Sequence, residues 1–145
     1  MKKFSIIAII ILFATACKKE EIGLTNPDLD VPEFVGNFNR TYKIVGSNFI
    51  ATYKIDTNKI EYSNEGNGPG NASYTILFDS YNETDKRWIG HTEDFKYYLI
   101  FFKNITATSI DLYKQKVSDP NEAQNTPIPA DDNDKNYGWN TYYKI

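Results

Sequence analysis

The sequence predicts an all-β domain over residues 34–145, built as an eight-stranded antiparallel up-and-down barrel with one short helix before the last strand. Short apolar stretches recur in this region with a period of two, which is the pattern of half-buried strands. Clusters of Asn, Asp, Gly and Ser separate the stretches, and Tyr, Phe, Ile and Thr dominate them. Strands that meander in this way remove their exposed edges by closing into a barrel.

The expected strands follow one another along the chain with compact connections between them. Gly46-Ser47-Asn48 and Asp56-Thr57-Asn58 are expected to be hairpin turns, and the glycine-rich stretch from Asn64 to Asn71 is expected to be a longer tip. The eight strands are predicted at Arg40 to Gly46, Phe49 to Ile55, Lys59 to Asn64, Ala72 to Asp79, Arg87 to His91, Phe95 to Lys103, Ile105 to Gln115, and Tyr137 to Lys144.

Alternate residues of the first four strands form an apolar set that should face the barrel interior, while residues such as Lys54 and Glu61 face outward. The stretch from Phe95 to Phe102 is instead apolar on both faces. We therefore expect its outer side to lie under a loop, a short helix or a partner chain. The expected inward set is Tyr42, Ile44, Phe49, Tyr53, Ile55, Ile60, Tyr62, Tyr74, Ile76 and Phe78.

A single short helix is expected after Asp119. This residue is a good N-cap, Pro120 suits the first helical position, and Glu122 is placed as a capping-box acid. Pro127 should end the helix after one or two turns. The helix lies in the stretch from Lys116 to Asn136, which contains no aromatic residue and is expected to form a lid or a loose surface loop.

Two short motifs carry a family resemblance. Phe34-Val35-Gly36-Asn37-Phe38 resembles the Gly-x-Trp opening of lipocalins and fatty-acid-binding proteins, with Phe38 in place of tryptophan. Pro129-Ala130-Asp131-Asp132 followed by Gly138-Trp139-Asn140-Thr141-Tyr142 is similar to the end of lipocalin-like bacterial lipoproteins. The resemblance implies a lipocalin-like (calycin) barrel and supports this fold more than any class of ligand.

Residues 1–16 have the features of a lipoprotein signal peptide. Lys2 and Lys3 precede an apolar run that is too short to span a bilayer. Ala14-Thr15-Ala16-Cys17 resembles the lipobox of bacterial lipoproteins, which implies that Cys17 is acylated and holds the protein at the outer membrane of the cell envelope. Residues 17–33 are then the lipidated cysteine and a flexible tether.

The orientation of the anchored protein is left open by the residues that follow Cys17. Lys18-Lys19-Glu20-Glu21 looks like the surface-export signal of lipoproteins from bacteroidete-type bacteria, but a solvated charged linker explains the same residues. The domain could face the periplasm or the cell surface.

Composition excludes several classes of partner. The chain has 16 Lys and Arg against 19 Asp and Glu, and it contains no basic run, so we expect no nucleic-acid partner. One cysteine and one histidine cannot form an ordinary Cys/His zinc site, and no cofactor is expected.

Two groups of polar residues are candidate chemical sites. His91 has Glu93 and Asp94 just after it, but no activated nucleophile accompanies it, so we expect a surface histidine and no catalytic residue. Asp132, Asp134 and Asn136 have the first spacings of a calcium loop, yet Tyr143 stands where that loop needs glutamate. We expect a solvated loop there and no metal site.

The aromatic residues give the leading hypothesis, which is a non-enzymatic binding module that holds a small apolar or aromatic ligand inside the barrel. Tyrosine and tryptophan offer apolar area with a polar tip, although for any single one of them core packing is the more common role. In the alternative, the barrel is filled and a protein partner or inhibitor target binds the exposed aromatic face or residues 116–136. A cavity of about 300 Å³ or more would favour the ligand. The candidate ligand-binding residues are Tyr53, Tyr62, Tyr74, Phe78, Trp88, Tyr98 and Trp139.

Overall fold

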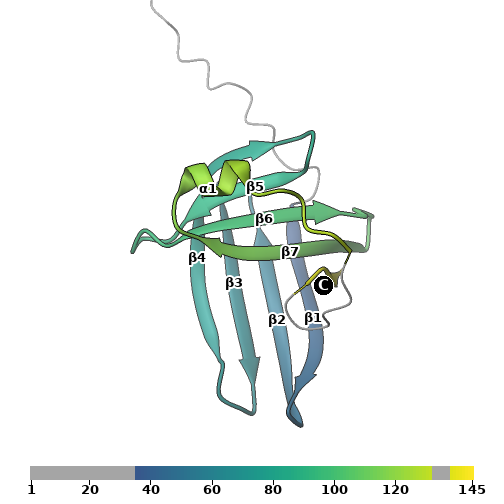
Figure 1. The fold of residues 1–145 in the computed structure, drawn as a ribbon. Helices are drawn as coiled ribbons and strands as arrows, with labels where there is room; N and C mark the ends of the chain where they lie inside the picture. Colours follow the sequence, from purple (N-terminus) through teal and green to yellow (C-terminus); the bar gives the residue numbers. More distant parts are fainter. Residues whose placement is uncertain (1–34, 132–137) are drawn as a thin grey trace, which may run out of the picture.

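The fold is a closed antiparallel barrel, seen in a computed structural model that describes residues 35–131 and 138–145 (Figure 1). Each strand pairs with the next along the chain, and β8 pairs with β1 to close the barrel. This confirms the predicted up-and-down barrel with one short helix before the last strand. The elements are β1 (Gly36–Ile44), β2 (Ser47–Ile55), β3 (Lys59–Gly66), β4 (Ala72–Asn82), β5 (Arg87–His91), β6 (Tyr97–Lys103), β7 (Ser109–Val117), α1 (Pro120–Asn125) and β8 (Asn140–Lys144).

Several sequence predictions lie outside the described residues. They are the signal peptide at 1–16, Cys17 with the tether to residue 33, and the acidic stretch with Asp132, Asp134 and Asn136. In the part of the chain that is described, no helix is long and apolar enough to cross a membrane.

The first hairpin turns earlier than predicted. Its two turn residues are Val45 and Gly46, with φ angles of 46° and 82°, and Ser47 already pairs with Ile44. Two residues with positive φ match the right-handed twist of the flanking strands, and this requirement decides the position of the turn. The predicted turn at Gly46-Ser47-Asn48 was therefore wrong by one or two residues.

The connection between β6 and β7 is longer than predicted. Ile105 does not begin a strand, because residues 104–108 form a turn in which the Thr106 Oγ1 accepts a hydrogen bond from the Ser109 N–H at 2.9 Å. Phe95 likewise lies in a loop, with a φ of 57°, and β6 begins at Tyr97. At the last strand, pairing begins at Asn140, and the predicted start at Tyr137 falls outside the described residues.

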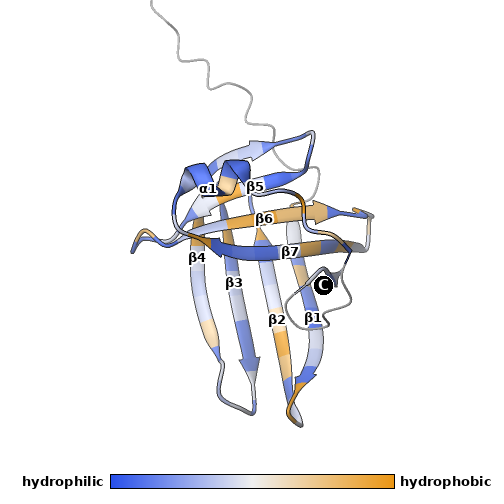
Figure 2. Cartoon of the chain, viewed as in Figure 1, coloured by the Kyte–Doolittle hydropathy of each residue, from blue (hydrophilic) through white to orange (hydrophobic). Residues whose placement is uncertain are grey.

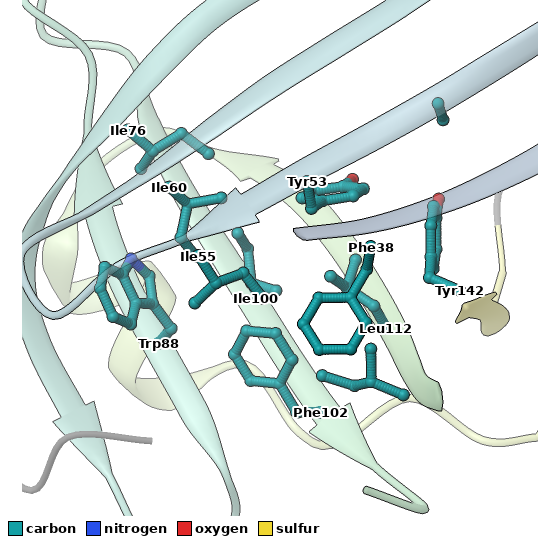
Figure 3. Close-up of a cluster of buried hydrophobic side chains, with 12 residues drawn as sticks. Phe38, Tyr53, Ile55, Ile60, Ile76, Trp88, Ile100, Phe102, Leu112 and Tyr142 are labelled. Atoms are coloured by element: carbon teal, nitrogen blue, oxygen red, sulfur yellow. The ribbon is translucent and has the colours of Figure 1, made fainter. Parts of the chain in front are cut away.

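The interior of the barrel is apolar and closely packed at one end. The residues predicted to face inward do so, since each belongs to the interior cluster or lines its adjoining cavity. Figure 3 shows Trp88 at one side of this cluster and Tyr142 at the other. The most deeply buried members of the packed end are Phe38, Ile60, Ile76, Trp88 and Ile100.

A second apolar cluster lies on the outside of the barrel, between α1 and the sheet. Strand β6 is hydrophobic over most of its length (Figure 2), and its Leu99 and Phe101 side chains pack with Ala123 of α1. A short helix therefore covers the outer side of this strand, which confirms one of the three covers expected from its two apolar faces. The helix begins as predicted, with the Asp119 carboxylate accepting hydrogen bonds from two N–H groups of the first turn.

Arg87 ties α1 to the barrel. Its guanidinium donates hydrogen bonds to the carbonyl oxygens of Ala123 at 2.9 Å and Thr126 at 3.0 Å, and it also binds the carbonyl of Gln124. These are carbonyls of the last helical turn and of the residue after it, which the helix itself leaves unpaired. A buried cation thus satisfies the end of the helix and fixes it over β5 and β6.

Candidate functional site: a tyrosine-lined cavity with two cations

A cavity of about 460 Å³ occupies the barrel end opposite the packed core. It lies next to the β1–β2 turn and the glycine-rich β3–β4 loop, and strands β7 and β8 complete its wall. The alternation of β-strands places these side chains inside, because every second residue points to the same face. The described lining residues are Arg40, Tyr42, Ile44, Phe49, Ala51, Tyr53, Tyr62, Asn64, Pro69, Gly70, Leu112, Lys114, Gly138, Asn140 and Tyr142.

Five tyrosines form a continuous belt around the interior, which we call the tyrosine belt. Strand register creates it, since Tyr53 pairs with Tyr62 and Tyr62 pairs with Tyr74 across neighbouring strands. Successive ring centroids are 5.0 to 5.1 Å apart, which is the separation of interacting aromatic rings. The members in order are Tyr142, Tyr53, Tyr62, Tyr74 and Tyr98.

Lys114 on β7 points into this belt. Its Nζ lies 3.2 Å from the ring centroid of Tyr62 and donates a hydrogen bond of 2.6 Å to the Tyr74 hydroxyl. The rings of Tyr53, Tyr74 and Tyr98 lie between 5.0 and 6.0 Å away, so four aromatic faces or edges surround the amine. Aromatic faces attract a cation, and together they offset part of the cost of removing it from water.

Among the described residues, no acidic side chain compensates the charge of Lys114. None of the salt bridges found among the described residues includes Lys114. Burial disfavours the ammonium form and lowers the pKa of Lys114 from 10.5 to about 7. The amine therefore changes its charge near neutral pH.

Arg40 contributes a second cation from β1. Its guanidinium carbon lies 5.0 Å from the ring centroid of Tyr42. Burial raises the pKa of the Tyr142 hydroxyl, and the positive charge of Arg40 offsets part of that rise. Asn64 holds the adjoining wall, because it accepts a hydrogen bond of 2.9 Å from the Tyr42 hydroxyl and donates one of 3.0 Å to the Gly70 carbonyl. The polar groups of this wall are thus already ordered.

The cavity and the outside of the protein differ in charge. The chain as a whole carries a formal charge of −3, yet the described lining holds Arg40 and Lys114 and no carboxylate. Low-dielectric walls strengthen the field of charges that line a cavity. The interior can therefore attract a negative group, while its tyrosine rings can pack against an apolar or aromatic body.

The sequence-predicted ligand residues fall into three places. Tyr53 and Tyr62 line the cavity, and Tyr74 and Tyr98 complete the belt around Lys114. Phe78 and Trp88 lie within the interior cluster, where their ring centroids are 4.7 Å apart.

Trp139 belongs to the outer cluster and does not line the cavity. Its Nε1 donates a hydrogen bond of 3.1 Å to the Pro129 carbonyl, and Lys103 Nζ lies 4.1 Å from its ring centroid. The side chain therefore fastens the segment before β8 to the outside of the barrel.

Sequence reasoning missed both cations of the cavity. The signal was present, because Arg40 stands two residues from both Phe38 and Tyr42, and Lys114 stands two residues after Leu112. Strict alternation places all of these side chains inside. A charged residue at an inward position of an otherwise apolar strand face is the pattern that would have identified them.

His91 lies outside the barrel interior. Its Nδ1 is 2.7 Å from Asp79 Oδ1, and the ring stacks on exposed Phe95 at a centroid distance of 5.8 Å. Asp79 reaches it from a bulge in the pairing between β4 and β5. The acid beside His91 is thus Asp79, whereas the neighbouring Asp94 pairs with Lys96.

Across residues 35–131 and 138–145, no group of three or more His, Cys, Asp or Glu side chains could hold a metal ion.

Comparison with known proteins gives no further assignment, since no family model, curated protein or solved structure matches the chain.

Proposed function

We propose that this protein is a non-enzymatic binding module of the bacterial cell envelope that holds a small apolar or aromatic ligand inside its barrel. The observation that carries the proposal is the cavity of about 460 Å³ among tyrosine rings. Its volume lies within the usual range of ligand sites, which begins at about 300 Å³. An eight-stranded barrel has room for one small ligand of this kind.

The makeup of the cavity supports binding over catalysis. Its described lining has no histidine, cysteine or carboxylate that could act together with Lys114 in catalysis, and His91 lies on the outer surface. The polar groups that are present are tyrosine hydroxyls, amides and two cations, which are suited to orienting a guest.

The test is native mass spectrometry of the protein purified from its own host, with two tryptophan variants as a matched pair. Ala51 is buried and lines the cavity, so Ala51→Trp should fill it and release a co-purifying small molecule. Ile50 is the preceding residue of β2 and is 47% exposed, so Ile50→Trp should leave the guest bound. A guest that is missing from the wild-type protein, or retained by Ala51→Trp, would contradict the proposal.

We further propose that the barrel is tethered to the outer membrane through acyl chains on Cys17. The support is the sequence of residues 1–17, whose charged start, short apolar run and small residues before the cysteine resemble a lipoprotein signal. Cys17→Ser should abolish incorporation of a labelled fatty acid and release the protein from the membrane fraction. Unchanged labelling in that variant would remove the anchor from the proposal.

A second candidate function, binding to a protein partner, rests on exposed apolar residues in the loops. Phe95 is 72% exposed at the tip between β5 and β6, and Val45 is fully exposed in the first hairpin. In contrast, the aromatic outer side of β6 is covered by α1 and offers little surface. A photo-reactive residue at position 95 should cross-link a specific protein in the native host if this function operates, whereas Ala51→Trp should leave such cross-linking unchanged.

A further inference from the structure

The charge of the cavity identifies the polar end of its guest. An ammonium that is mostly removed from water is costly unless a negative group or a full set of hydrogen bonds compensates it. In the described protein, the only hydrogen-bond partner of the half-buried Lys114 Nζ is the Tyr74 hydroxyl. Arg40 adds a guanidinium to the lining of the same cavity. Among the described residues, a negative group is what Lys114 lacks.

We infer that the guest is an organic anion whose carboxylate, sulfonate or similar group binds at Lys114 and Arg40 while its aromatic or apolar body packs against the tyrosine belt. The inference rests on the proposed function, because it specifies the ligand of the same cavity. It assigns a separate task to each part of the site. The two cations set the charge of the guest, and the rings set the shape of its body.

The geometry around Lys114 favours this role over simple space filling. The hydrogen bond to Tyr74 and the contact with the Tyr62 ring fix the end of a side chain that is otherwise flexible, and thus direct its remaining N–H groups. A side chain that only filled the belt would need no charge, and methionine of similar length would pack as well. An anion bound beside Lys114 would instead favour the ammonium form of its amine, which burial disfavours.

The experiment compares two fluorescent probes that share one ring system. 8-Anilinonaphthalene-1-sulfonate carries a negative charge, and N-phenyl-1-naphthylamine is the same molecule without the sulfonate. Both are titrated into the full chain with Cys17 replaced by serine, so that neither acyl chains nor detergent compete for the cavity. Lys114→Met removes the charge, Lys114→Arg keeps it, and Lys116→Met makes the same change at an exposed position of the same strand. Thermal unfolding of each variant verifies that it is folded.

The expected result is one bound sulfonate probe per chain, at least about tenfold tighter than the neutral probe, because a charge-assisted hydrogen bond in a cavity contributes that much or more. Lys114→Met should lower this preference several-fold, because only Arg40 then remains beside the sulfonate, while Lys114→Arg and Lys116→Met should retain it in full. Ala51→Trp should block both probes, which places binding in the cavity.

Equal binding of the two probes, or a preference that Lys114→Met leaves unchanged, would overturn the anionic guest and leave the ligand-binding function intact. Binding of neither probe to the folded wild-type protein, together with no co-purifying guest, would overturn the proposed function and the anionic guest with it.

Discussion

Replacing Lys114 with methionine should stabilise the ligand-free protein at neutral and acidic pH. Burial lowers the pKa of Lys114 from 10.5 to about 7 in the folded protein, whereas the amine of the unfolded chain keeps its proton to about pH 10. The unfolded state therefore binds more protons than the folded state between pH 7 and 10.5, and the free energy of unfolding rises with pH over that window. Below pH 7 the full cost of the buried charge is present, and above pH 10.5 it vanishes.

The size of the effect follows from the same pKa values. A fall from 10.5 to about 7 corresponds to at most about 5 kcal/mol at low pH, since each pKa unit is about 1.4 kcal/mol. The partial exposure of Lys114 and the tyrosine rings around its amine reduce this figure. We expect wild-type stability to rise by about 1 to 2 kcal/mol between pH 7 and pH 9 from this residue alone.

The assay is urea unfolding followed by tryptophan fluorescence at pH 6, 7, 8 and 9, with wild type, Lys114→Met and Lys116→Met compared at each pH. The difference between wild type and Lys114→Met isolates the buried amine, because all other titrating groups are shared. It should shrink as pH rises, while Lys116→Met, which removes an exposed charge, should follow the wild type. A difference that stays constant from pH 6 to pH 9 would refute the assignment of an uncompensated charge to Lys114.

Three further substitutions test how the barrel is held together. Arg87→Met should lower the free energy of unfolding by about 3 kcal/mol and speed hydrogen exchange in α1, because buried helix-end carbonyls lose their donor. Gly90→Ala should destabilise by about 2 kcal/mol in urea unfolding, because its Cβ would lie 2.3 Å from the Leu77 carbonyl oxygen and 2.7 Å from Ile76 Cγ2. Val45→Asn should raise the melting temperature and increase the free energy of unfolding by about 1 kcal/mol, because a β-branched side chain is strained at a φ of 46°.

Each of these substitutions has a control or a contrary outcome. Arg87→Lys keeps one donor and should recover less than half of the loss, so full recovery would show that charge alone holds α1. A wild-type melting temperature for Gly90→Ala would mean that β4 shifts freely away from β5. For Val45, replacement by threonine retains the branched Cβ and should bring no gain, and equal gains from asparagine and threonine would contradict the strain argument.

Periodicity was sufficient to predict the number and order of the strands and the inward faces of the first four. In Phe49, Tyr53 and Ile55, for example, the spacing of two defines one face of β2, and the structure places all three inside. The apolar run through Leu99 and Phe101 also predicted that the outer side of this strand is covered, because a strand without a polar face is buried on both sides. These features depend on neighbours along a single strand, which a sequence displays directly.

Turn positions and the cavity depended on information that strand patterns lack. Val45 prefers strands, yet it occupies a turn because the twist of the hairpin requires positive φ there. Tyr53 and Trp88 are both inward aromatics, but Tyr53 borders the cavity and Trp88 is enclosed in the packed core. Their different surroundings are set by their height along the barrel axis, which follows from register between strands and not from the order of residues in one strand.

The two ends of the barrel interior have different roles: the packed end stabilises the fold, and the other end holds the cavity. At the packed end, Trp88 and Ile100 are fully buried, and each large apolar side chain there contributes about 2 to 3 kcal/mol. At the cavity end, the charged form of Lys114 lowers the free energy of unfolding unless a negative group binds beside it. A substitution at Lys114 should therefore make the protein more stable and less selective at the same time, as is usual when a site is built from groups that disfavour the empty state. Loss of selectivity without any gain in stability would instead show that Lys114 is already compensated in the unliganded protein.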